Sequence, residues 1–275
     1  MAALSFAALR GAVGFLTRVP IGHDNTGWEA FTRTPATFPA VGYLVGVLGA
    51  LVFLVPATPT VTAFLYVLVL YAVTGINHAD GVADLGDAAV VHGDAERRRE
   101  VLKDGTLGVG GTFALVGLIV GLVLVAVPLA GVPIAVAASI VIAAEVGARL
   151  GTAALVCVGT APHEGLGSQL TGVNGPRSLV APVLIALPAV VLARPSYVAT
   201  AAVVAAVAVA VALYRWSGPT LGGVNGDVLG ATTELGRLAG LLVGVLAWTL
   251  WTGDATLVGT LPTGEVTEVI AWTLS

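Results

Sequence analysis

The chain has 275 residues, of which 57% are hydrophobic and only 10% are charged, with a net charge of −4 and a mean hydropathy of +0.97. Because a soluble domain carries about 25% charged residues, this chain has too few charges to cover a water-facing surface. No basic tract suggests a nucleic-acid partner, and the single cysteine, Cys157, excludes a disulfide framework or a CxxC metal site within the chain. The composition therefore predicts an integral membrane protein.

The residues before the first long apolar run are expected to form a short helix, at 3–19, on the membrane surface or packed against a helix bundle. No charge precedes Arg10, and Arg18 and Pro20 interrupt the apolar residues after it. The segment therefore lacks the basic start and the uninterrupted apolar core of a signal peptide.

Apolar runs continue along the rest of the chain. A helix needs about 20 mostly apolar residues to cross a bilayer, and tight breaks containing proline and glycine separate these runs. The sequence thus predicts an all-α bundle of about seven transmembrane helices joined as antiparallel hairpins. The C-terminal residues, with Glu265 and Glu268, are either a tail or an eighth helix. The expected spans are 38–56, 60–76, 110–129, 133–158, 179–193, 197–214 and 238–251.

Glycines recur at helical spacing inside two of these spans. Gly42, Gly46 and Gly49 lie about one turn apart, and so do Gly117 and Gly121. Small residues at this spacing let helix backbones approach closely in lipid, so these positions are expected at helix contacts.

Basic residues set the expected orientation, because short loops rich in Lys and Arg stay in the cytoplasm. With seven spans, nearly all basic residues fall on the side of the N-terminus, including Arg215 and Arg237 before the last span, and only Arg194 falls on the opposite side.

The chain is then predicted to be one membrane-embedded domain, 1–275, with a cytoplasmic N-terminal segment. That segment is 1–35, and the cytoplasmic polar segments 77–109, 159–178 and 215–237 carry the site.

The longest polar stretch contains three aspartates, Asp80, Asp84 and Asp87. In a helix their carboxylates fall within about 60° of one another, because each residue turns the chain by about 100°. Like charges one turn apart destabilise a helix, which favours a bound cation. Oxygen ligands suit Mg²⁺ or Mn²⁺ bridging to phosphates. A solvated acidic helix end is the alternative.

A basic run lies next in the chain. Arg97, Arg98, Arg99 and Lys103 can hold phosphate oxygens, and the glycine-rich start of the next helix can present backbone N–H groups to an anion. The same run is equally typical of a topology signal.

Inside the predicted span 133–158, Glu145 and Arg149 are spaced i, i+4. Ionisable residues inside a membrane are expensive and usually face the bundle interior. The two side chains are therefore expected to pair with each other, either as a structural pair or facing a substrate cavity.

Two later polar segments lie on the same expected side. His163 is expected in a loop that touches substrate. Asn225 belongs to a turn signal, and Asp227 and Glu234, spaced i, i+7, share one face of the next helix. A plain turn with Asp227 as a helix cap is the alternative.

These segments resemble the cobalamin synthase family, the cobalamin 5′-phosphate synthases. Two motifs carry the resemblance: HxDGxADxxD at 78–87 and GDVLGA at 226–231. Together they are specific for the family, whereas either motif alone is weak evidence for it. Ala88 stands where the family usually has Gly, and Gly105 where it usually has Ser; neither change removes a charged group. Other matching segments are FLTRVPI at 15–21, FPAVG at 38–42, VLKDGTLG at 101–108 and GLG at 165–167.

The resemblance implies transfer of the cobinamide-phosphate part of adenosylcobinamide-GDP to α-ribazole or its 5′-phosphate, with release of GMP, at the cytoplasmic membrane. It also implies a divalent metal. Phosphoryl transfer is mostly positioning and charge stabilisation. Asp80, Asp84 and Asp87, with Asp104 or Asp227, are expected to bind one or two Mg²⁺ ions.

The remaining candidates have other expected roles. Lys103 and an arginine neutralise the leaving GMP, and Asp227 or His78 accepts the proton of the 5′-hydroxyl of ribazole. The expected substrate-binding residues are Arg97, Arg98, Arg99, Glu145, Arg149, His163, Asn225 and Glu234.

Two other classes of protein are weighed against this one. CDP-alcohol phosphatidyltransferases also place several aspartates on membrane helices, but their signature has Ala-Arg after Asp-Gly, whereas Ala83 is followed here by Asp84. Transporters usually show internal repeats and a site near the midplane. This chain shows no clear repeat, and its acidic groups cluster at one edge. The sequence leaves an oligomer open.

Overall fold

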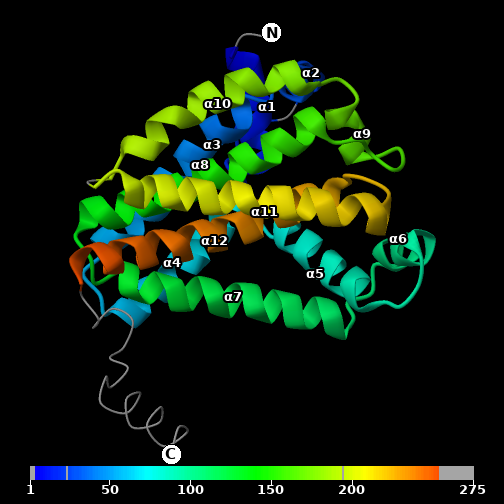
Figure 1. Ribbon diagram of the computed structural model, residues 1–275. Coiled ribbons are helices and arrows are strands. Elements are labelled where there is room, and N and C mark those ends of the chain that lie inside the picture. The colour runs from blue at the N-terminus through cyan, green and yellow to red at the C-terminus, as the bar shows by residue number, and fades with distance from the viewer. Residues whose placement is uncertain (1–3, 23, 194, 254–275) are drawn as a thin grey trace, which may run out of the picture.

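A computed structural model describes residues 4–22, 24–193 and 195–253, and within these ranges the chain is helix and loop without a strand. Arg194 and the C-terminal residues for which a tail or eighth helix is expected lie outside the described residues. The α-helices, labelled in Figure 1, are α1 (Phe6–Leu16), α2 (Asn25–Thr32), α3 (Thr37–Ala50), α4 (Pro59–Thr74), α5 (Asn77–Val90), α6 (Ala95–Asp104), α7 (Val109–Leu129), α8 (Ile134–Val158), α9 (Leu166–Thr171), α10 (Val180–Ala186), α11 (Tyr197–Leu221) and α12 (Gly226–Thr252).

Five helices of the described residues are long and apolar enough to cross a membrane: α3 with its 3₁₀ extension, α7, α8, α11 and α12. Helices α4 and α5 add a sixth only if they are counted as one span bent by 99°. The all-α membrane architecture is confirmed, but the count of about seven is not. The expected span 179–193 is part of a run of 3₁₀ and α turns, Pro176–Val191, that is too short to be counted among the spans. The run changes from α to 3₁₀ at Leu187, next to Pro188, which lacks the N–H that an α-helix needs.

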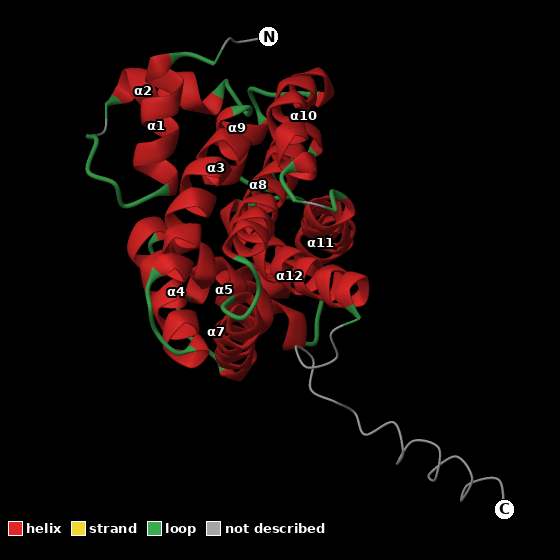
Figure 2. Cartoon of the chain, turned by 90° about the vertical axis from the view of Figure 1, so that its left-hand side faces the viewer, coloured by secondary structure: helices red, strands yellow, loops and turns green. Residues whose placement is uncertain are grey.

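Helix α8 is the central helix of the bundle and packs against α3, α11 and α12; in Figure 2 it lies between α3 and α11, which is seen nearly end-on. The expected close packing is confirmed at two glycines of α3. A Cβ at Gly42 would lie 2.9 Å from the Cα of Val146, and one at Gly46 would lie 2.7 Å from the Cα of Ile142. Gly117, in contrast, has no neighbour within 4 Å of such a Cβ.

The polar segments meet at one end of the bundle, on the right in Figure 1, where α5, α6 and α9 lie beside the connection from α11 to α12. The chain reaches this end through a sharp bend after α4, where Gly75 has a φ of +73°, a conformation that favours glycine. Helix α1 forms within the expected range and packs on α2 and α3.

Candidate active site

Helix α5 confirms the helical reading of the aspartate-rich segment. Asp80 is exposed, Asp84 is half-buried and Asp87 is buried. The two oxygens of Asp87 accept hydrogen bonds from the backbone N–H groups of Gly108, at 2.8 Å, and Gly111, at 2.9 Å. Asp87 therefore holds the start of α7 in place, since a carboxylate satisfies the free N–H groups of a helix N-terminus.

Two glycines bring α5 against the start of α12. A Cβ at Gly81 would lie 2.6 Å from the backbone oxygen of Asp227, and one at Gly230 would lie 3.2 Å from the Cα of His78. This approach places Asp84 within electrostatic reach of Asp227 as well as of its own helix neighbours. The carboxylates of α5 and α12, distant in sequence, therefore belong to one site.

Asn225 fixes the position of Asp227. Its side-chain oxygen accepts the N–H of Val228 at 3.0 Å and so caps α12, as side-chain amides do at this position. Its side-chain nitrogen donates to Asp227 Oδ2 at 2.7 Å. The alternative in which Asp227 itself caps the helix is wrong, because Asn225 does so.

A cavity of about 420 Å³ opens beside Asp227 at this end of the bundle. It is large enough for a nucleotide-sized ligand. Its wall is apolar where α1, α3 and α9 contribute Phe15, Phe38, Leu166 and Leu170. Its polar lining comprises Thr74, Asn77, His78, Arg99, Lys103, Arg149, Thr152, His163, Asn225 and Asp227.

The basic run of α6 divides into cavity residues and surface residues. Arg99 and Lys103 line the cavity, and Arg99 donates to the backbone oxygen of Leu221 at 3.2 Å. Arg97 is exposed and pairs with Glu100 at 2.9 Å. Arg98 donates to the backbone oxygen of Ala88 at 2.8 Å. The structure thus brings one of the three arginines into the cavity.

Asp104 lies away from the other aspartates. It is exposed at the end of α6, and its Oδ2 accepts a hydrogen bond from the Thr106 hydroxyl at 2.8 Å. Four aspartates are the expected metal ligands. Asp87 caps α7 and Asp104 bonds the Thr106 hydroxyl, which leaves the carboxylates of Asp80 and Asp84 for a metal.

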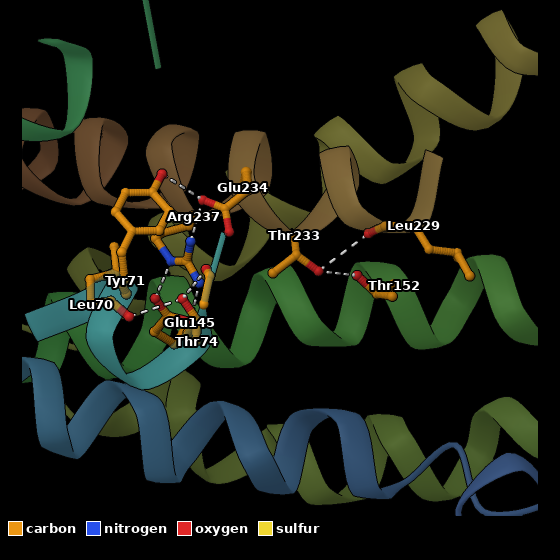
Figure 3. Close-up of polar contacts among 10 residues, drawn as sticks. Leu70, Tyr71, Thr74, Glu145, Thr152, Leu229, Thr233, Glu234 and Arg237 are labelled. Carbon is orange, nitrogen blue, oxygen red and sulfur yellow. Dashed lines mark hydrogen bonds and ion pairs between the residues drawn. The ribbon is translucent and has the colours of Figure 1, made fainter. Parts of the chain in front are cut away.

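The buried ionic residues pair differently from expectation. Glu145 pairs with Arg237 of α12 and not with Arg149: both its oxygens accept from the Arg237 guanidinium, one of them at 3.2 Å. Arg237 also donates to Glu234 Oε2 at 2.6 Å, and the Tyr71 hydroxyl donates to the same oxygen at 3.1 Å (Figure 3).

This network corrects the expected position of two residues. Arg237 and Glu234 are fully buried in α12, whereas 215–237 is expected to be a cytoplasmic polar segment. Arg237 is thus a link between α8 and α12, and Glu145 and Glu234 lie outside the lining of the cavity. The hydroxyls of Thr152 and Thr233, 2.9 Å apart, join the same two helices nearer the cavity.

The cavity includes residues that the search for charged motifs misses. Thr74 and Thr152 resemble ordinary helix residues in the sequence, and Phe38 resembles a residue of an apolar span. The signal for Phe15, Phe38 and Leu166 lies only in the segments that resemble the family, because apolar periodicity alone does not separate a cavity wall from a core.

The acidic residues fit a metal that is shared with a substrate. Among the described residues no group of three or more His, Cys, Asp or Glu side chains forms a metal site by itself. Mg²⁺, however, usually binds one or two carboxylates and completes its shell with water and substrate phosphates. Asp227 offers such a carboxylate in the cavity lining, and Asp80 and Asp84, which are outside that lining, lie within electrostatic reach of it.

A helical membrane bundle with a carboxylate, three cationic side chains and an apolar wall around one cavity has the site of a membrane enzyme that acts on phosphate esters. A family model described as cobalamin-5-phosphate synthase matches residues 8–247. The chain belongs to the cobalamin-5-phosphate synthase family.

Relatives named adenosylcobinamide-GDP ribazoletransferase match along most of their length. The one from Halorubrum lacusprofundi is 55% identical over 251 residues, 88% of this chain and 98% of the relative. The one from Haloquadratum walsbyi is 46% identical over 252 residues, 89% of this chain and 99% of the relative. The one from Escherichia coli O157:H7 is 35% identical over 241 residues, 84% of this chain and 96% of the relative. No solved structure matches the chain.

Proposed function

We propose that the chain transfers the cobinamide-phosphate part of adenosylcobinamide-GDP to α-ribazole or its 5′-phosphate and releases GMP. The observation that carries this proposal is the cavity in which Asp227 shares a lining with Arg99 and Lys103. In such a cavity the carboxylate can act as the base for the nucleophile, and the two cations can stabilise the negative charge of the leaving group.

The transfer forms a bond between a ribazole hydroxyl oxygen and the phosphorus attached to cobinamide. The bond from that phosphorus to the bridging oxygen breaks, and its electron pair leaves on GMP. Asp227, oriented by Asn225, accepts the hydroxyl proton. His78 is the alternative base, because it lines the same cavity.

Lys103 and Arg99 would hold the diphosphate and neutralise the charge that develops on GMP. Both groups come from α6 and belong to the cavity lining, and cations beside phosphate oxygens stabilise such transition states. His163, from the loop before α9, lines the cavity as well and would contact substrate there.

Asp80 and Asp84 would hold Mg²⁺, with Mn²⁺ as the alternative, together with the diphosphate. When bound, the metal supplies positive charge that weakens the repulsion between the diphosphate and the carboxylates. Asp84 interacts electrostatically with Asp80, Asp87 and Asp227, so a cation at this place relieves like-charge repulsion within the protein too.

We place the polar end of the bundle at the cytoplasmic face of the cell membrane. Arg97, Arg98, Arg99 and Lys103 all lie on α6 at this end, and basic residues beside membrane spans favour the cytoplasm. The long apolar helices would stand in the lipid bilayer, with the cavity open to soluble substrates.

The test is release of GMP by purified protein in detergent, given adenosylcobinamide-GDP and α-ribazole with Mg²⁺, and then with EDTA. Release that requires both substrates and the metal supports the proposal. Release from CDP-linked alcohols instead would assign the chain to the phosphatidyltransferase chemistry, and no release from any donor would refute a transferase.

A further inference from the structure

Arg149 is a fully buried cation without a hydrogen-bond partner. Its side chain is 0% exposed, and none of its three guanidinium nitrogens bonds to any described residue. Arginine carries five N–H donors, and a buried charged group left without partners is strongly unfavourable. Such a residue indicates a partner that is not part of the chain.

The nearby carboxylates do not serve as that partner. Glu145, one turn before Arg149, gives both oxygens to Arg237, and Glu234 gives Oε2 to Arg237 and Tyr71. The two carboxylates and the two arginines together have no net charge. The network therefore leaves the N–H donors of Arg149 without a carboxylate partner among the described residues.

Arg149 borders the cavity at its buried end. Lys103 marks the exposed end of the same cavity, and Thr152, one turn after Arg149 on α8, is 2% exposed. His78, whose Nδ1 atom also has no partner among the described residues, lies within electrostatic reach of Arg149. The cavity thus has two cationic regions, one on α6 near the opening and one on α8 in the interior.

We propose that Arg149 binds the phosphate monoester of the acceptor and so determines the preference for a phosphorylated ribazole; this proposal rests on the proposed transferase function. A guanidinium matches two phosphate oxygens at once. The corrinoid donor is far larger than a cavity of about 420 Å³, so its diphosphate meets Lys103 and Arg99 near the opening. The smaller acceptor can reach the buried end.

This placement orients the acceptor for transfer. The 5′ oxygen of a phosphorylated ribazole already carries phosphate, so another hydroxyl of the ribose must attack. With the 5′-phosphate held at Arg149, the ribose extends toward Asp227, which lines the same cavity. Arg149 is therefore a specificity-determining residue, and the base is a separate group.

The test compares two acceptors, α-ribazole 5′-phosphate and α-ribazole, in wild-type protein and in Arg149→Met and Arg149→Lys. The readout is the ratio of kcat/KM for the two acceptors. We expect Arg149→Met to lower this preference on the order of 100-fold and Arg149→Lys to lower it less, because lysine keeps the charge without the planar pair of donors. Lys103→Met is the matched control: it lowers kcat/KM for both acceptors and leaves their ratio within about twofold.

An unchanged ratio in Arg149→Met, or an equal loss with both acceptors, would overturn the proposal and assign Arg149 to the donor or to folding. A melting curve of each variant in detergent identifies a folding defect. Turnover of α-ribazole by the wild type tests the transferase function by itself. Inorganic phosphate gives a readout without turnover: it should raise the melting temperature of the wild type and not of Arg149→Met, and equal shifts in both would contradict an anion site at Arg149.

Discussion

Replacing Arg237 with Met should destabilise the bundle severely. Arg237 is fully buried and bonds to Glu145 of α8 and Glu234 of α12. Methionine fills a similar volume, so the change chiefly removes the charge. Two buried carboxylates then lose their bonded counter-charge, and removing one partner of a buried pair costs about 3–5 kcal/mol. Arg149, which lies near Glu145 in α8, offsets part of the loss.

The assay is equilibrium unfolding in mixed micelles by SDS titration, followed by circular dichroism. Arg177→Met is the matched control, because Arg177 is exposed on the surface and its loss should cost less than about 0.5 kcal/mol. If the free energy of unfolding of Arg237→Met lies within about 1 kcal/mol of the wild-type value, the buried ion network is not what fixes α8 against α12.

Three further changes test the site and its support. Asp84→Asn should abolish GMP release while the protein still inserts and melts normally; near-normal turnover would remove Asp84 from the site. Asp87→Ala should lower the free energy of unfolding by about 1–2 kcal/mol through loss of the cap on α7, measured by SDS titration, and an unchanged value would contradict the capping role. Gly81→Leu should separate α5 from α12 and abolish turnover, because a Cβ at position 81 would lie 2.6 Å from the Asp227 backbone oxygen. The control Gly218→Leu should be active, because the space around position 218 is open. Equal activity in the two variants would refute the close approach of α5 to α12.

Local spacing predicts local structure in this chain. The i, i+4, i+7 aspartates do lie on one helix, and Gly42 and Gly46 do lie where another helix approaches. These features depend on residues within a few turns of one another, for which helical periodicity is a sufficient guide.

Partners distant in sequence could not be predicted in the same way. Glu145 and Arg149 have ideal spacing for a pair, but Arg237 reaches Glu145 from α12 because that helix packs along α8. Asp87 matches the other aspartates in spacing but is bonded by backbone groups of Gly108 and Gly111, at the start of α7.

The count of spans also depends on features that hydropathy does not record. The run 179–193 is apolar throughout, yet it belongs to a stretch of 3₁₀ and α turns, Pro176–Val191, that is too short to count as a span. Helix α4 is followed by a bend of 99° and not by a loop across the membrane face. Hydropathy measures whether a segment can lie in lipid and not whether it continues straight.

The most direct measurement of the central claim is GMP release by Asp227→Asn compared with the wild type. Asparagine preserves the size of Asp227 and a hydrogen bond to Asn225, so melting should be unchanged, while the site loses its carboxylate. We predict that turnover falls on the order of 100-fold or more, as expected when a general base is removed. Turnover near the wild-type rate in a normally folded variant would contradict the assignment of transfer to the cavity beside Asp227.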